Sequence, residues 1–104
     1  MRISRGDVFW IRDREGRRRP GLILTRDSAI PLLNRVVVAP ATRTIRGIPT
    51  EVRADRADGM PADCAFSIDN IRVVPKSALT RRITTLDAAR LDEACEAVAY
   101  ALGC

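Results

Sequence analysis

Histidine is absent from the 104 residues of this chain. It is the usual general base near neutral pH, a common metal ligand and the partner of nucleophilic serines and cysteines, so those arrangements are excluded. Cysteine is scarce: Cys64, Cys95 and Cys104 are widely spaced and odd in number. Neither a disulfide framework nor a zinc site is indicated, and we expect Cys64 and Cys95 to be buried thiols. We expect no metal and no cofactor, so any catalysis must use other groups.

Long apolar stretches are also missing. Nothing approaches the roughly 18 consecutive apolar residues of a membrane-spanning helix. The N-terminus shows no signal-peptide pattern, because Arg2 and Arg5 are followed by Gly6 and Asp7 rather than by an apolar segment. We therefore expect a cytoplasmic protein. A chain of this length should form one domain, residues 1–104, close to the lower size limit, where dimerisation would add stability.

Lysine is nearly missing, since Lys76 is the only one among 18 basic residues. The arginines are unevenly placed. Residues 1–53 hold 12 arginines against 5 acidic residues, whereas residues 54–104 hold 6 basic and 8 acidic ones. The net charge is +5 and the sequence pI is about 10.1. Such clustering of positive charge in one half favours a polyanionic partner.

Short apolar segments separated by turn residues predict a mainly-β fold. We expect strands at residues 6–12, 21–25, 35–39, 50–54, 64–68, 71–74 and 81–84. Pro20 should open the second strand and Pro40 should end the third, because proline cannot donate to a strand ladder. Residues 28–33 predict a loop or a short helical turn. Many short strands of this kind are typical of a small barrel or sandwich.

The C-terminal segment has a different pattern, in which apolar residues recur every three or four positions: Leu91, Ala94, Cys95, Val98 and Leu102. This spacing predicts an amphipathic helix over residues 85–102 that ends at Gly103. Thr84 or Thr85 is the expected N-cap, and the carboxylate of Asp87 favours a helix N-terminus. The sequence thus predicts a β body, residues 1–84, followed by one helix.

The segment RRRPGLILT, residues 17–25, joins three arginines to an apolar strand. Pro20 fixes the backbone where this strand begins, so Arg19 should project from a rigid edge. An arginine presents a planar fork of donors that matches phosphate oxygens. Arg19 is therefore a candidate phosphate-binding residue.

Two other groups of residues receive no chemical role. The turn carboxylates Asp55, Asp58 and Asp63 lack regular metal-ligand spacing, and we expect them to be solvated. The aromatic residues are as consistent with a core as with base stacking: Phe9, Trp10, Phe66 and Tyr100.

Four motifs occur in order along the chain: GDVFW at 6–10, RRRPGLILT at 17–25, VVVAPATRTIRGIPTEV at 36–52 and DNIRVVPKSALTRRI at 69–83. Together with the closing helix they resemble the MazF/PemK family of toxin endoribonucleases over nearly the whole chain. The resemblance implies an SH3-like barrel with a C-terminal helix, and a homodimer. It also implies sequence-selective, metal-independent cleavage of single-stranded RNA to 2′,3′-cyclic phosphate and 5′-hydroxyl ends. Translation and growth would be inhibited.

The resemblance implies that the catalytic residues are Arg19, before the proline, and Thr42, which closes the P-x-T motif. A fixed guanidinium suits the charge that builds when a 2′-hydroxyl attacks the adjacent phosphate. Our RNA-binding candidates are Arg17, Arg18, Arg43, Thr44 and Arg46, with Asn70 to read a base edge. The family is normally inhibited by an antitoxin whose acidic, largely disordered C-terminal segment lies over the RNA groove.

Two features depart from the family pattern. The hairpin loop before Arg19 is short and lacks the glycine-serine-glutamate stretch of many relatives, with Glu15 as its remnant. Arg12 stands where relatives usually have aspartate. The first departure bears on the recognised RNA sequence, and the second on how the loop is anchored.

Two alternative functions are open to the sequence. A toxin of the same barrel class that resembles CcdB would bind DNA gyrase through its C-terminal helix and cut nothing, so Arg19→Ala would leave it toxic. A nucleic-acid-binding barrel without activity would bind RNA in a salt-sensitive manner and leave it intact.

Overall fold

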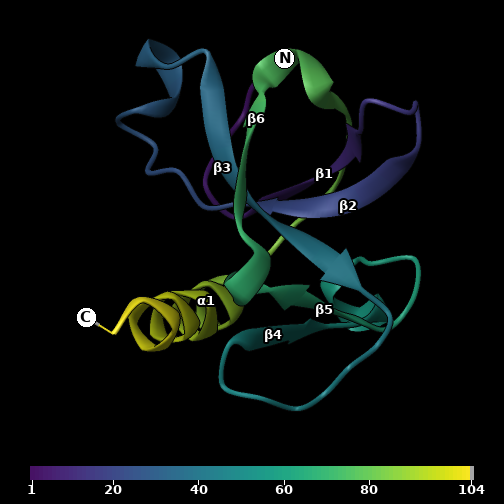
Figure 1. Cartoon of the computed structure of the whole chain (residues 1–104), viewed down its shortest axis with the longest axis vertical. Coiled ribbons are helices and arrows are strands. Elements are labelled where there is room, and N and C mark those ends of the chain that lie inside the picture. The colour runs from purple at the N-terminus through teal and green to yellow at the C-terminus, as the bar shows by residue number, and fades with distance from the viewer. Residues whose placement is uncertain (104) are drawn as a thin grey trace.

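The structure is a computed structural model that describes residues 1–103 (Figure 1). Its strands are β1 (Asp7–Arg12), β2 (Arg18–Ile23), β3 (Arg35–Thr42), β4 (Glu51–Ala54), β5 (Cys64–Ser67), β6 (Arg72–Pro75) and β7 (Leu79–Thr85). The 3-10 turns are η1 (Ile30–Leu32), η2 (Arg56–Asp58), η3 (Ile68–Asn70) and η4 (Lys76–Ala78), and the helix is α1 (Ala88–Leu102). The expected mainly-β fold with a C-terminal helix is confirmed, as is a helical turn within residues 28–33.

Strand β3 is central because it takes part in two sheets. The strands are antiparallel in the order β4-β5-β3-β2-β1-β7, and β6 also pairs with β3. The first part of β3 lies against β2 and β6, whereas its last two residues pair with β5 (Figure 1). The prediction that Pro40 ends this strand is wrong. Pro40 lies opposite Gly21, and the pairing with β5 starts at the next residue, so the strand continues to Thr42.

Strand β2 begins at Arg18, earlier than expected. Pro20 lies opposite Trp10 of β1, and the pairing of β2 with β3 starts only at Gly21. The missing N–H of Pro20 therefore falls outside the β2–β3 ladder. Gly21 leaves room for the side chain of Ile11, whose Cδ1 would have to move if a Cβ were present there. Arg18 and Arg19 consequently belong to a paired strand rather than to the turn.

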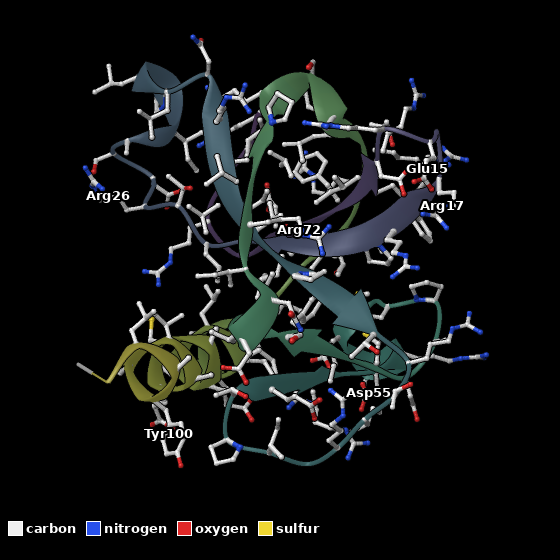
Figure 2. All side chains as sticks on the ribbon, in the orientation of Figure 1. Glu15, Arg17, Arg26, Asp55, Arg72 and Tyr100 are labelled. Carbon is white, nitrogen blue, oxygen red and sulfur yellow. The ribbon has the colours of Figure 1, made fainter. Side chains whose placement is uncertain are left out.

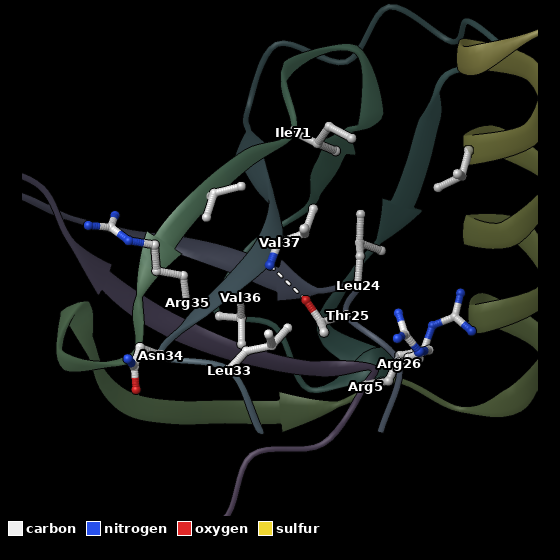
Figure 3. Close-up of a pocket in the computed structure, with 12 residues that line it drawn as sticks. Arg5, Leu24, Thr25, Arg26, Leu33, Asn34, Arg35, Val36, Val37 and Ile71 are labelled. Carbon is white, nitrogen blue, oxygen red and sulfur yellow. Dashed lines mark hydrogen bonds between the residues drawn. The ribbon is translucent and has the colours of Figure 1, made fainter. Parts of the chain in front are cut away.

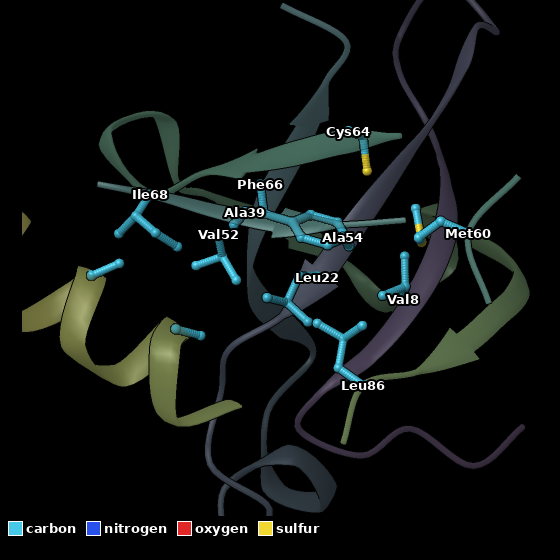
Figure 4. Packing of buried hydrophobic residues seen from close by; sticks show 12 residues of the cluster. Val8, Leu22, Ala39, Val52, Ala54, Met60, Cys64, Phe66, Ile68 and Leu86 are labelled. Carbon is cyan, nitrogen blue, oxygen red and sulfur yellow. The ribbon is translucent and has the colours of Figure 1, made fainter. Parts of the chain in front are cut away.

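Two hydrophobic cores lie on opposite faces of β1, β2 and β3. Successive residues alternate between them, as strand geometry requires. Val8 and Leu22 belong to the core beneath α1, whereas Phe9 and Ile23 belong to the other core, and all four are fully buried. Figure 4 shows the first core, in which Leu22 lies near Val8 and the Phe66 ring. Both faces of β1 are therefore covered by apolar side chains.

Helix α1 begins three residues later than expected. Its N-cap is Asp87, whose Oδ1 accepts a hydrogen bond from the Arg90 N–H at 2.9 Å. The prediction of Thr84 or Thr85 as N-cap is wrong, because both belong to β7. Thr85 instead donates its hydroxyl to the buried carboxylate of Asp7 at 2.7 Å. The helix ends at a left-handed glycine, Gly103, as predicted.

The buried face of α1 is formed by the small residues Ala94 and Ala97, which let the helix approach β4 closely. Cys95 is exposed, so the prediction of a buried thiol there is wrong, whereas it is confirmed for Cys64. Cys104 lies outside the described residues. Within the described part of the chain, α1 is neither long nor apolar enough to cross a membrane, and the same holds for the 3-10 turns.

Candidate active site

Arg19 and Thr42 line the same hollow, which has a volume of about 320 Å³. The pairing of β2 with β3 brings the strands that carry Arg19 and Thr42 side by side. The β2–β3 ladder ends where Gly21 lies opposite Pro40, so Arg19 and Thr42 each lie two residues beyond the last pair of these strands. The walls of this hollow, called here the reaction pocket, come from β1, β2, the end of β3 and residues 60–64.

The basic residues of the reaction pocket are not neutralised by the protein. Arg18, Arg19 and Arg43 line it, and all three are exposed. Within residues 1–103, none of them is recorded in a salt bridge or a side-chain hydrogen bond. Three uncompensated guanidinium groups around one small hollow create a positive potential that attracts an anion such as a phosphodiester.

Arg17 differs from its two neighbours because the hairpin loop holds its side chain. Its Nε lies 3.2 Å from Asp13 Oδ2, and its Nη2 forms an ion pair with Glu15 (Figure 2). Asp13 Oδ1 also accepts the backbone N–H groups of Glu15 and Arg17, each at 2.9 Å. Desolvation acts to raise the pKa of Asp13, but these hydrogen bonds and the Arg17 charge keep it below its usual value. Asp13 therefore anchors the loop, directly after Arg12.

Thr42 is half-buried, and its hydroxyl orientation is fixed by the next turn. Its Oγ1 accepts the backbone N–H of Thr44 at 3.1 Å. This bond uses one lone pair of the oxygen, so the hydroxyl hydrogen can still be donated to a group in the reaction pocket. Thr44 thus acts through its backbone, as a support for Thr42.

Of the six predicted RNA-binding residues, four do not line the reaction pocket: Arg17, Thr44, Arg46 and Asn70. The loop that carries Arg46 is held by Glu51, whose Oε1 accepts the N–H groups of Arg46 and Gly47 at 2.9 Å. Asn70 lies on η3 and donates from Nδ2 to Ser67 Oγ at 2.7 Å. Both side chains are exposed, but neither lines the pocket that holds Arg19.

A second hollow, of about 240 Å³, lies on the other side of Arg19. Arg12, Arg17 and Arg72 line it, and Figure 2 shows Arg72 facing the β1–β2 hairpin. Arg12 and Arg72 were not among the residues expected to bind RNA. Arg72 reaches this place only because β6 pairs with β3, with Arg72 opposite Val38. Arg19 and Pro20 line both hollows, and the two hollows together are called here the basic groove.

Two pocket residues were not expected in the site. Trp10 is half-buried and lines the reaction pocket, while Val8 and Phe9 on the same strand are fully buried. Asp63 is exposed, as expected, yet it lines the pocket too, and within residues 1–103 its carboxylate forms no hydrogen bond or salt bridge. The alternation of β1 could have indicated Trp10, but nothing in the turn sequence distinguishes Asp63 from its neighbours.

The other two turn carboxylates have structural roles. Asp55 and Asp58 form a reciprocal capping box around η2. Asp58 Oδ1 also lies 3.2 Å from Arg90 Nε of α1. Desolvation acts to raise the pKa of Asp58, but the hydrogen bonds from Arg90 and the Asp55 backbone hold it below its usual value. Nowhere in residues 1–103 do three acidic or cysteine side chains gather in a way that could hold a metal ion.

Cys64 forms part of the wall of the reaction pocket. Burial raises the pKa of its thiol, and the carboxylates of Asp58 and Asp63 raise it further. A thiol with a raised pKa stays protonated and is a poor nucleophile. Cys64 therefore contributes apolar surface to the pocket and not a reactive group.

Comparison with known proteins agrees with this fold. Residues 4–102 match the family model described as PemK-like, MazF-like toxin of type II toxin-antitoxin system. The chain is 41% identical over 103 residues to the probable endoribonuclease MazF2 of Mycobacterium tuberculosis (strain CDC 1551 / Oshkosh), covering 98% of this chain and 100% of that protein.

Two solved structures extend the comparison. The Mycobacterium tuberculosis toxin MazF-mt6 superposes with a TM-score of 0.85 at 35% identity, over 93% of this chain and 96% of the toxin. A mycobacterial endoribonuclease in complex with its cognate antitoxin gives 0.86 at 27% identity, over 98% and 96%. The sequence match runs through both strands that carry Arg19 and Thr42, and the chain belongs to the PemK-like, MazF-like family of toxins of type II toxin-antitoxin systems.

Proposed function

We propose that this chain is a sequence-selective endoribonuclease toxin that cleaves single-stranded RNA without a metal ion. The products would be a 2′,3′-cyclic phosphate and a 5′-hydroxyl end. The observation that supports this most directly is the reaction pocket, in which Arg19 and Thr42 lie beside two further unpaired arginines. The relatives named as endoribonucleases add support.

The reaction is an intramolecular transesterification. The ribose 2′-oxygen attacks the adjacent phosphorus and loses its proton, the bond from phosphorus to the 5′-oxygen breaks, and the 5′-oxygen takes up a proton. Negative charge builds on the non-bridging oxygens, where a fixed guanidinium stabilises it. Arg19 supplies this group from a paired strand. An arginine stays protonated in proteins, so it acts as a hydrogen-bond donor and not as a base.

Thr42 holds the phosphate in position. Its free hydroxyl hydrogen can bond a phosphoryl oxygen, which keeps the 2′-oxygen, the phosphorus and the 5′-oxygen in line. Single-stranded RNA is the natural substrate, because an A-form duplex hides its base edges and restrains this alignment. The basic groove around Arg19 would bind the flanking phosphates through Arg12, Arg18, Arg43 and Arg72. With RNA as its substrate, we propose that the protein acts in the cytoplasm.

The decisive experiment maps RNA ends that carry a 5′-hydroxyl in cells that express the wild type, Arg19→Ala or Arg82→Ala. Arg82 is an exposed arginine of β7 that lines neither hollow, so it controls for the loss of one charge. We expect new ends with the wild type and Arg82→Ala only. The same cleavage should persist with purified protein in a chelator.

Equal sets of ends for the wild type and Arg19→Ala would refute the assignment of Arg19. Toxicity that survives Arg19→Ala without RNA cleavage would support gyrase binding instead. Salt-sensitive RNA binding with no cleavage would indicate the inactive binding barrel.

The proposed inhibitor is an antitoxin with an acidic, largely disordered C-terminal segment that covers the basic groove. The mycobacterial relative was solved with its cognate antitoxin, and the groove here carries uncompensated positive charge. An acidic peptide should therefore compete with RNA, and replacement of its acidic residues by amides should abolish the competition. Competition that survives the amide replacement would contradict this mode of inhibition.

The proposed assembly is a homodimer that uses the apolar hollow between β3, β6 and α1 (Figure 3). This hollow has a volume of about 760 Å³ and is lined mainly by apolar side chains, Leu24, Leu33, Val37, Ile71, Val73 and Val98, together with Arg5, Arg26 and Arg35. Leu33 and Val73 are 45% and 57% exposed, an unusual exposure for large apolar side chains that lie together. A second copy of the chain would remove this surface from water.

A further inference from the structure

We propose that the reaction pocket holds one nucleobase beside the scissile phosphate, stacked on Trp10, and that Asp63 selects a base with an amino donor over uracil. This inference rests on the proposed ribonuclease function and adds the chemical identity of one recognised nucleotide. It is carried by three observations: the wall chemistry of the pocket, the exposure of Trp10 and the unpaired carboxylate of Asp63.

The pocket is apolar on one side and charged on the other. Trp10, Pro20, Ala41, Met60 and Pro61 supply the apolar surface, and the arginines and Thr42 supply the polar edge. A phosphate needs only the polar edge. The apolar side calls for a flat, weakly polar group attached to that phosphate, and the adjoining nucleobase is the part of RNA that fits this description.

Trp10 provides a stacking surface at a fixed place. It lies on β1 between β2 and β7, directly opposite Pro20 in the sheet. Its indole is half-buried, so part of it faces the pocket while the rest is held by the fold. Bases stack on exposed aromatic rings in single-strand-binding proteins, because every base has a π-face.

Asp63 is the one acidic residue among the described residues that line the reaction pocket. A carboxylate there repels a phosphate. Within residues 1–103, Asp63 forms no salt bridge with the neighbouring arginines. It directly precedes the buried residue Cys64, the first residue of β5, which fixes its position. An ionised carboxylate can only accept hydrogen bonds, so its natural ligand here is a donor on the base edge.

The base edges differ in the donors that they offer to such a carboxylate. Guanine presents an N–H and an amino group side by side, which match the two carboxylate oxygens. Adenine and cytosine each present one amino group. Uracil presents a single N–H between two carbonyl oxygens, and those oxygens are repelled by a carboxylate. Asp63 should therefore favour guanine most and uracil least.

The first test measures kcat/KM on RNA oligonucleotides that contain one cleavage site, with each of the four bases in turn on either side of the scissile bond. At one of these two positions the wild type should cleave guanine at least about fivefold better than uracil, the lower bound for one good side chain–base pair. Asp63→Asn should lose most of this ratio. Asp92→Asn, which removes an exposed carboxylate of α1, should keep it.

The outcomes separate the two proposals. A wild type that cleaves no RNA overturns the ribonuclease function. A wild type that cleaves RNA without any preference against uracil overturns only the role of Asp63. If Asp63→Asn slows all four substrates equally, Asp63 acts on the reaction and not on the choice of base, and the inference is again wrong.

The second test uses Trp10, the sole tryptophan of the chain, as its own fluorescent probe. Oligonucleotides with a 2′-deoxynucleotide at the cleavage position cannot react and can be titrated at equilibrium. We expect quenching of Trp10 by the guanine-containing oligonucleotide and little quenching by a matched abasic one. Equal quenching by both would show that no base stacks on Trp10.

Discussion

Three consecutive arginines have different roles in this protein. Arg17 is held by two carboxylates of the hairpin loop, whereas Arg18 and Arg19 line the reaction pocket and form no salt bridge within residues 1–103. The difference comes from position alone: the turn ends at Arg17 and the strand begins at Arg18. A cluster of charge in a sequence therefore overstates the charge available to a ligand.

This difference gives a prediction for RNA binding. Arg18→Ala should weaken binding to a non-cleavable oligonucleotide and reduce the slope of log K against log salt by about one. Arg17→Ala should change that slope less, because its charge is already compensated by Asp13 and Glu15. Titrations at several salt concentrations measure both slopes. A slope that falls by the same amount in both variants would contradict the distinction.

Thr42 gives a second prediction. Thr42→Val removes the hydroxyl that would bond the phosphate, and also the acceptor of the Thr44 N–H. A hydrogen bond to a charged group contributes about 1.5–3 kcal/mol, so single-turnover cleavage should slow by roughly 10- to 150-fold. Thr42→Ser keeps the hydroxyl and should retain most of the rate. A serine variant as slow as the valine variant would show that the methyl group matters instead.

The strands and the helix could largely be predicted from sequence, and the reasons for the errors are specific. Alternation of apolar residues locates a strand but does not reveal its partners, so the change of partner at Pro40 could not be seen. For α1, the apolar spacing identified the helix, but packing against β4 selected the alanine face and left Cys95 exposed. The family motifs indicated Arg19 and Thr42 as site residues. The position of Asp63 in the reaction pocket depends on how the chain folds and could not be predicted from the sequence.

Helix α1 is tied to η2 by the partly buried ion pair of Asp58 and Arg90, whose side chains are 11% and 26% exposed. The pKa of Asp58 is lowered in the folded state, so the pair stabilises the fold above the unfolded-state pKa of about 3.9. This stability is lost as the pH falls through the folded-state pKa.

Asp58→Asn should therefore lower the free energy of unfolding by about 1–3 kcal/mol at neutral pH. The difference from the wild type should shrink below about pH 4, where the wild-type carboxyl also becomes protonated. Urea unfolding of both proteins at several pH values measures this difference in the free energy of unfolding. Asp92→Asn, at an exposed position of the same helix, serves as the control and should show no such pH dependence. A difference that stays constant with pH would show that the stabilisation does not depend on the ionised Asp58 carboxylate.

At the scale of the whole molecule, the mainly apolar hollow shares no lining residue with the reaction pocket or with the second hollow beside Arg19. The apolar hollow lies between β3, β6 and α1, while the unpaired arginines surround Arg19. Leu33→Asp combined with Val73→Asp should place two carboxylates in the proposed dimer interface and yield a monomer. Sedimentation velocity measures the change, with Tyr100→Ser, at an exposed residue outside this hollow, as the control. A double variant that sediments as the wild type would place the interface elsewhere.

The path of β3 has a consequence for regulation. Arg19 is fixed to the sheet that contains β1, while Thr42 is hydrogen-bonded into the sheet of β4 and β5. The relative position of Arg19 and Thr42, which would bind the same phosphate, therefore depends on the angle between the two sheets. A ligand that changed this angle at the junction of the two sheets would reduce activity without contacting either side chain.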